Sequence, residues 1–103
     1  MRSWSELHAA LQELMGESVK VYFQPPENFK LSYPCVVFDR TTALMNYADN
    51  KPYQVTKRYT VTLISKTADN EELLDKLLKF PMATYDRQFI NDNLVHDVFS
   101  VYY

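Results

Sequence analysis

The sequence predicts a single α+β domain over residues 1–103, with a mainly antiparallel sheet and two helices packed on one of its faces. Two segments carry leucines at helical spacing, and the other apolar residues fall into short β-branched or alternating runs. The expected order of elements is α-β-β-β-α-β-β. With 103 residues, of which 47% are hydrophobic, the chain can bury one modest core, and a second domain is not expected.

The first helix is expected near the N-terminus, where apolar residues recur every three or four positions at Trp4, Leu7, Leu11 and Leu14. Ser3 is placed to cap this helix, with Glu6 completing a capping box. Gly16 is placed to end it.

Two short apolar runs predict the strands that follow. Residues 19–23 are β-branched or aromatic, and Pro25-Pro26 must end this strand because two successive prolines lack the amide donors of a ladder. Residues 33–40 contain Cys35-Val-Val-Phe without alternation, which favours a strand covered on both faces and central in the sheet.

The longest alternation of apolar and polar residues runs from Tyr53 to Ser65, and only Lys57 breaks it. Fully extended, this stretch would span roughly 43 Å, whereas a globule of this length has a diameter of about 33 Å. The strand should therefore bend sharply or protrude. Its expected partner is residues 38–46, joined to it through the turn at residues 48–52. We expect an arm-like β-hairpin.

The second helix is expected after Asp69, which forms a capping box with Glu72, and Pro81 should stop it. Residues 83–103 then predict a hairpin around Asn91-Asp92-Asn93. A three-residue loop at this point pairs Phe89 with Val95, Arg87 with Asp97, and Tyr85 with Phe99. The edges of the resulting sheet should remain exposed.

No catalytic, cofactor or metal site is expected. The single glycine excludes the glycine-rich phosphate loops of nucleotide-binding folds. His96 and Asp97 are neighbours on a strand and point to opposite faces, so they cannot act as an acid/base pair. His8 lacks a second ligand at helical spacing, and we expect it in solvent or in a contact between helices. Cys35 should be buried, with a raised pKa.

Nucleic acid is not the default partner, because the chain has 11 basic and 13 acidic residues and therefore no overall positive charge. One alternative stays open, a small single-strand nucleic-acid-binding or regulatory interaction module. Its stacking, cationic surface would consist of Tyr47, Tyr53, Tyr59, Tyr102 and Tyr103 beside Lys51, Lys57 and Arg58. Tyrosine is also enriched in protein interfaces, and we favour protein partners.

Targeting signals are not expected. The first 16 residues carry Glu6 and Glu13 in a periodic pattern unlike a signal peptide. No apolar run approaches the roughly 18 residues that a membrane span needs. We expect synthesis in the cytoplasm and no membrane partner.

Three stretches of the chain carry a resemblance to a known family: Tyr33-Pro-Cys-Val-Val-Phe, then Ala48-Asp-Asn-Lys-Pro-Tyr with Lys57-Arg-Tyr-Thr-Val-Thr, then Asp92-Asn-Leu-Val-His-Asp-Val-Phe. Together they resemble the small tail-completion proteins of long-tailed bacteriophages or prophages, also called tail terminators, minor tail proteins or head-tail joining proteins. The resemblance extends from about residue 20 to the C-terminus and includes segment order, helix placement and length. Its motifs are structural and include no catalytic residue.

The resemblance implies a structural virion protein of the tail or neck, assembled in the cytoplasm of the bacterial host and not an enzyme. It implies a ring, usually hexameric, that caps the tail tube and offers a docking surface to the head-tail connector or neck protein. DNA would pass through the lumen only as cargo. We expect Tyr47, Asp49, Lys51 and Tyr53, at the tip of the arm, to lie in an interface with another subunit.

Overall fold

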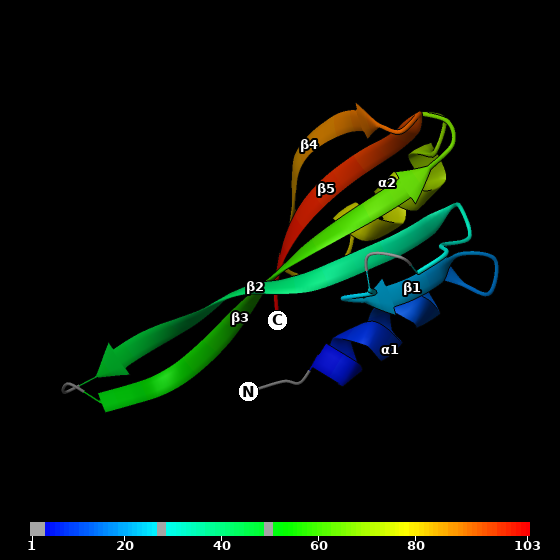
Figure 1. Cartoon of the computed structure of the whole chain (residues 1–103). Helices are drawn as coiled ribbons and strands as arrows, with labels where there is room; N and C mark the ends of the chain where they lie inside the picture. Colours follow the sequence, from blue (N-terminus) through cyan, green and yellow to red (C-terminus); the bar gives the residue numbers. More distant parts are fainter. Residues whose placement is uncertain (1–3, 27–28, 49–50) are drawn as a thin grey trace.

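The computed structural model describes residues 4–26, 29–48 and 51–103, and the side chains of residues 41–57 lie outside this description. The order of elements is the predicted one: α1 (Trp4–Met15), β1 (Lys20–Phe23), β2 (Cys35–Ala48), β3 (Lys51–Ser65), α2 (Glu71–Leu78), β4 (Ala83–Asn91) and β5 (Leu94–Tyr102). The strands form one sheet in the spatial order β1-β2-β3-β5-β4 (Figure 1). β1 pairs parallel to β2, and the other neighbouring strands pair antiparallel. The predicted α+β class is therefore confirmed.

Both helices pack on the same face of the sheet. The register places Phe38 opposite Val61 and Val61 opposite Phe99, so these three side chains project from one face. They belong to a single buried cluster that also contains Leu7 of α1 and Leu77 of α2. The core of the domain therefore lies between this face and the two helices.

The predicted periodicity of α1 is confirmed, because Leu7 and Leu11 are fully buried. The helix ends at Gly16, as predicted. This glycine has a φ of 84°, which favours glycine over residues with a Cβ, and its N–H donates to the Gln12 carbonyl at 3.0 Å. The predicted cap, Ser3, lies outside the described residues.

The capping box predicted for α2 is wrong. Asn70, not Asp69, occupies the cap position, and its side chain makes no capping hydrogen bond. Its amide group instead donates to Ser65 Oγ and to the Thr67 carbonyl, each at 2.5 Å. The short loop between β3 and α2 thus uses the side chain that would otherwise cap the helix.

The hairpin of β2 and β3 extends beyond the rest of the sheet, as predicted. β1 pairs with β2 only as far as Phe38, and β5 pairs with β3 only as far as Arg58. From Ala43 and Lys57 to the turn, the two strands pair with each other alone and project from the domain (Figure 1). The molecule accordingly measures 50 × 28 × 25 Å along its principal axes. We call residues 39–48 and 51–57 the arm.

The prediction that residues 33–40 form the central strand is wrong in one respect. β2 is covered on both faces, since Cys35, Val36 and Phe38 are fully buried. The middle position, however, belongs to β3. The C-terminal hairpin adds to the free side of β3, whereas only the four-residue β1 adds to β2.

The register predicted for the C-terminal hairpin is wrong near its turn. The turn has two residues, Asp92 and Asn93, with φ values of 51° and 61°. Two successive residues with positive φ define the tight turn that matches the twist of a hairpin, and Asp and Asn tolerate it. Phe89 therefore pairs with His96 instead of Val95.

A β-bulge then corrects the register along the strand. Near the turn, Arg87 lies opposite Val98 instead of Asp97, which is one residue away from the predicted pairing. An irregularity between Tyr85 and Arg87 inserts one extra residue into β4. The predicted pairing of Tyr85 with Phe99 is confirmed for this reason.

We predict that Asn93→Ala lowers the free energy of unfolding by about 1 kcal/mol, because alanine is disfavoured at positive φ. Urea unfolding monitored by circular dichroism measures this change. Asn91→Ala, one residue before the turn and without a positive φ, serves as the control. Equal effects of the two substitutions would contradict the described turn.

Candidate functional site

The outer edge of β1 is closed by two side chains of α1. The Gln24 N–H donates to the Phe38 carbonyl, so the even-numbered residues of this segment face β2 and Val21 faces outward. The outward N–H of Val21 donates to Gln12 Oε1 at 3.0 Å, and Gln12 Nε2 donates to the Val19 carbonyl at 2.9 Å. The amide of Gln12 thus pairs with this edge as the peptide group of a neighbouring strand would.

His8 completes the closure of the β1 edge. Its Nε2 lies 2.8 Å from the Val21 carbonyl, and its ring lies 6.0 Å from that of Phe38. The expectation that His8 lies in solvent or between helices is therefore wrong. The histidine contacts a strand, because the side chain at this position of α1 points toward β1. The expectation that the sheet edges remain exposed is likewise wrong for β1.

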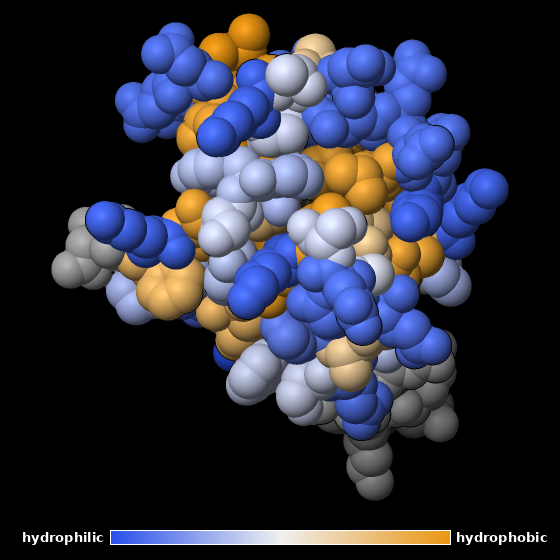
Figure 2. All heavy atoms as spheres, turned by 90° about the vertical axis from the view of Figure 1, so that its right-hand side faces the viewer, coloured by the Kyte–Doolittle hydropathy of each residue, from blue (hydrophilic) through white to orange (hydrophobic). Residues whose placement is uncertain are grey.

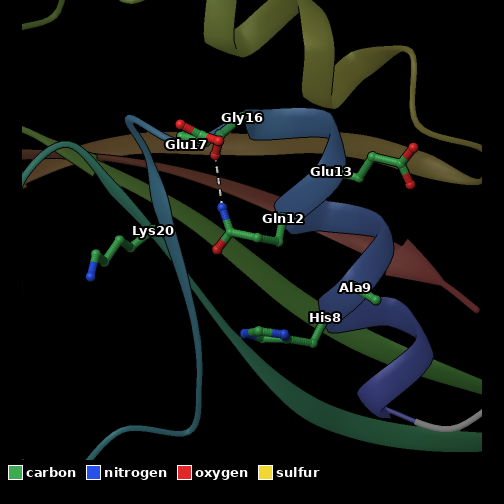
Figure 3. Close-up of a pocket in the computed structure, with 7 residues that line it drawn as sticks. All are labelled: His8, Ala9, Gln12, Glu13, Gly16, Glu17 and Lys20. Carbon is green, nitrogen blue, oxygen red and sulfur yellow. Dashed lines mark hydrogen bonds between the residues drawn. The ribbon is translucent and has the colours of Figure 1, made fainter.

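A hollow of about 620 Å³ lies beside this closed edge. Its lining residues are His8, Ala9, Gln12, Glu13, Gly16, Glu17 and Lys20 (Figure 3). Gln12 is turned toward Gly16, whose carbonyl accepts a hydrogen bond from its Nε2 at 2.8 Å. Glu13 and Lys20 point away from each other in this view. The charged groups therefore do not converge on one ligand position.

A second hollow, of about 580 Å³, lies on the other side of His8 and is mostly aromatic and proline-lined. Trp4 stacks on Phe23 with ring centroids 4.4 Å apart, and Tyr22 meets Phe29 edge to face at 5.4 Å. These rings pack against one another and so form the wall of the hollow. The wall presents apolar surface and no arrangement of reactive groups.

The opposite edge strand, β4, is exposed along almost its whole length. Seven large hydrophobic residues are exposed in the described part of the chain, and four of them lie at or just before this strand: Met82, Tyr85, Phe89 and Ile90. Figure 2 shows hydrophobic residues at the top of the molecule, the end where Figure 1 places both the turn between β4 and β5 and the loop between β3 and α2. Exposed large apolar side chains are thus more numerous along this edge strand than on any other element of the described chain.

The carboxyl group of Asp97 in β5 binds side chains of β4 on the helix side of the sheet. Asp97 is fully buried, and its Oδ1 accepts hydrogen bonds from Tyr85 Oη at 2.8 Å and Gln88 Nε2 at 2.9 Å. Burial, and then the bond with Asp97 and its charge, raise the pKa of Tyr85. Asp97 Oδ2 has no partner among the described residues.

The sequence predicted Arg87 as the partner of Asp97, and this pair is not formed. The two-residue turn places Arg87 opposite Val98 and so on the other face of the sheet, where its guanidinium lies 5.4 Å from the Phe89 ring. His96 stacks on the same Phe89 at 4.6 Å. His96 and Asp97 therefore lie on opposite faces of the sheet, as predicted.

The face of the sheet away from the helices also joins β3, β5 and β4 through polar side chains. Ser100 Oγ donates to Asp86 Oδ2 at 2.6 Å, and Arg58 Nη2 donates to the same Ser100 Oγ at 3.1 Å. Asp86 is the extra residue at the bulge. These bonds hold the strand at the point where its ladder is interrupted.

The predicted site residues at the tip of the hairpin are placed only in part. Next to the turn, Tyr47 pairs with Pro52 and Lys51 pairs with Ala48, and Tyr53 follows on β3. Their side chains, and the whole of Asp49, lie outside the described residues. Tyr59, assigned to a possible stacking surface, is fully buried and lies in the core instead, because its strand position faces the helices.

Within the described ranges, no group of three or more His, Cys, Asp or Glu side chains is placed to hold a metal ion. Neither described helix has the length and apolar composition that crossing a membrane requires. In comparisons with known proteins, no family model and no curated protein matches the chain.

We predict that Gln12→Ala speeds hydrogen exchange of the Val21 amide and lowers the free energy of unfolding by about 1–2 kcal/mol, because the substitution removes its partner. Nuclear magnetic resonance follows this amide directly. Glu13→Ala, an exposed neighbour on α1, is the matched control and should leave Val21 unchanged. An unchanged exchange rate in Gln12→Ala would show that the edge is closed by another group.

Alkaline pH should destabilise the fold through Cys35. Burial raises the pKa of its thiol from 9.0 to about 11, and burial also raises the pKa of Tyr59. A raised folded-state pKa gives stability that is present below the unfolded pKa and is lost as the pH rises toward the folded one. Between pH 9 and about 11 the loss due to the thiol is about 1.4 kcal/mol per pH unit.

Urea unfolding over this pH range, under reducing conditions, measures the effect. In Cys35→Ala the free energy of unfolding should depend less on pH above pH 9. The contribution of Tyr59 and Tyr85 above pH 10 should remain. The same slope in both proteins would contradict a buried, uncharged thiol.

Proposed function

We propose that this protein is a structural assembly component of a long-tailed bacteriophage or prophage. In this role, copies of the chain associate into a ring that caps the tail tube and provides the docking surface for the head-tail connector or neck protein. The tail and neck partners and the usual hexameric number follow from the family resemblance. DNA is only cargo passing through the lumen, and the mildly acidic net charge of −2 suits such a passage.

The observation that carries this proposal is the arm. An isolated two-stranded hairpin is marginally stable in water, yet residues 43–48 and 51–57 continue the β2–β3 ladder where neither β1 nor β5 lies beside it. Backbone edges left unpaired in this way are templates for pairing with another chain. A partner that covers the arm would explain why it extends so far.

A ring requires two different, complementary surfaces on each copy, because its contacts run head to tail. The arm projects from one end of the sheet, whereas the exposed β4 is an edge strand with its turn at the other end (Figure 1). Two separate candidate surfaces are thus present on one chain. The tip residues Tyr47, Asp49, Lys51 and Tyr53 are the proposed interface positions of the arm.

The alternative of a single-strand nucleic-acid-binding module gains no support from the geometry. Of the five tyrosines on which that hypothesis rests, Tyr59 is buried in the core and Tyr102 and Tyr103 are half-buried. Stacking of bases needs exposed aromatic faces. We therefore retain the assembly function.

Electron microscopy of phage particles produced without this protein tests the proposal. We expect overlong tail tubes, or heads and tails that remain unattached. A variant with serine at the four tip positions should give the same phenotype while folding normally. As a matched control, Glu13→Ala on α1 together with Glu17→Ala just after this helix, both at exposed positions, should give intact particles. Normal virions in the absence of the protein would refute the assignment.

A further inference from the structure

We propose that the outer edge of β4 accepts a β-strand from a second copy of this chain, and that the donated strand is the arm segment of β2, residues 39–48. The inference rests on the proposed self-association and names the two surfaces that meet in it. Its evidence is the hydrogen-bonding state of the strand edges, which differs from one edge of the sheet to the other.

The outer edge of β4 has free backbone groups at regular intervals. A two-residue turn makes Asn91 and Leu94 a hydrogen-bonded pair, and alternation along the strand then directs Phe89 toward β5. Gln88 and Ile90 consequently direct their N–H and C=O groups away from the sheet. Within the described ranges, no hydrogen bond reaches these outward groups.

Side chains along this edge are exposed as well. Ile90 is 72% exposed and Phe89 is 39% exposed, on opposite faces of the strand. A strand laid beside β4 would cover part of both while it pairs with Gln88 and Ile90. Main-chain hydrogen bonds and flanking apolar contacts are the two components of recognition by strand addition.

The other edge of the sheet cannot accept a strand in the same way. There the outward N–H and C=O of Val21 already have partners in Gln12 and His8. Edge strands of native proteins are usually blocked by such devices, so the contrast with β4 is informative. Of the two edge strands, β1 is thus closed at Val21, whereas β4 is open.

The arm offers two outer edges, and their sequences differ. On β3 the segment 51–57 contains Lys51, Pro52 and Lys57, and lysine and proline are residues that block the pairing of an edge strand. On β2 the segment 39–48 is charged only at its base, at Asp39 and Arg40, and the remaining residues, 41–48, read Thr-Thr-Ala-Leu-Met-Asn-Tyr-Ala with neither charge nor proline. The β2 side is therefore the edge left open for pairing.

A second copy is the occupant that satisfies both open edges at once. If β4 paired with β4 of another copy, a two-fold dimer would form and the β2 side of each arm would stay unpaired. When the arm of one copy pairs with β4 of the next, every copy both donates and accepts a strand. The contact is then head to tail, as a closed ring requires.

Disulfide trapping between copies tests this pairing. One protein carries Ile90→Cys, and the other carries Ala43→Cys, Leu44→Cys, Met45→Cys or Asn46→Cys, four positions that scan the unknown register. Cys35 can remain because it is fully buried. We expect a mixed disulfide at one or two arm positions, since a bridge needs Cβ atoms about 3.5–4.5 Å apart.

Lys20→Cys, an exposed position on the closed β1 edge, is the matched control and should form no mixed disulfide with the arm variants. A mixed disulfide at none of the four positions would overturn the proposal. So would an Ile90→Cys protein that bridges only to itself, because that result indicates pairing of β4 with β4.

Association measured by sedimentation gives a second readout. Ile90→Lys should weaken self-association by about tenfold or more, because lysine on an open edge opposes pairing. Leu78→Lys removes an exposed apolar residue of α2 and should leave association unchanged. Equal weakening by both substitutions would contradict the role of the β4 edge.

The strand pairing and the phage function can be tested independently. Mixed disulfides together with normal virions in the absence of the protein would refute the virion function and support the pairing. Abnormal tails without any mixed disulfide would support the function and overturn the pairing.

Discussion

The pairing of β2 with β3 is the interaction on which the rest of the structure depends. Its first half forms the centre of the sheet, where Phe38 and Val61 face both helices. β1 pairs with β2 as far as Phe38, and β5 pairs with β3 as far as Arg58, so both flank this half of the ladder. The second half continues as the arm without further support. One ladder thus provides both the core of the domain and its most extended surface.

The two edge strands of the sheet differ in whether their outward backbone groups are hydrogen-bonded. This difference leaves β4, and not β1, able to pair with a strand of another copy. Gln12 and His8 satisfy the outward groups at Val21, so β1 is closed by the chain itself. β4 is instead held in place from within, by Asp97 on one face and by the Ser100–Asp86 bond on the other. A strand that is fixed and still unpaired on its outer side is ready to bind another strand without prior rearrangement.

Sequence patterns predicted the elements that depend on periodicity. The alternation from Tyr53 to Ser65 predicted the long strand, and the leucine spacing predicted both helices. Because this strand is longer than the expected diameter of the globule, the protruding hairpin was predictable as well. Details that depend on a choice among similar polar residues were not predictable. Asp69 and Asn70 can each cap a helix, and only the loop contacts of Asn70 decide between them. The sequence around Asp92 and Asn93 is compatible with a turn of two or three residues. Because the turn has two, Asp97 lies opposite Gln88 and not opposite the predicted Arg87.

Of the features described at the candidate surfaces, some could be predicted from the sequence and others could not. The arm was predictable, because its evidence is the length of one strand. The closed edge of β1 was not, because Gln12 and His8 are unremarkable in a helical pattern and gain their role only when β1 lies beside them. Residue-resolved hydrogen exchange, measured at increasing protein concentration, tests the central claim most directly. We expect new protection at Gln88, at Ile90 and across residues 39–48, with Val21 unchanged. Protection gained at the β1 edge, or at neither β4 nor the arm, would contradict it.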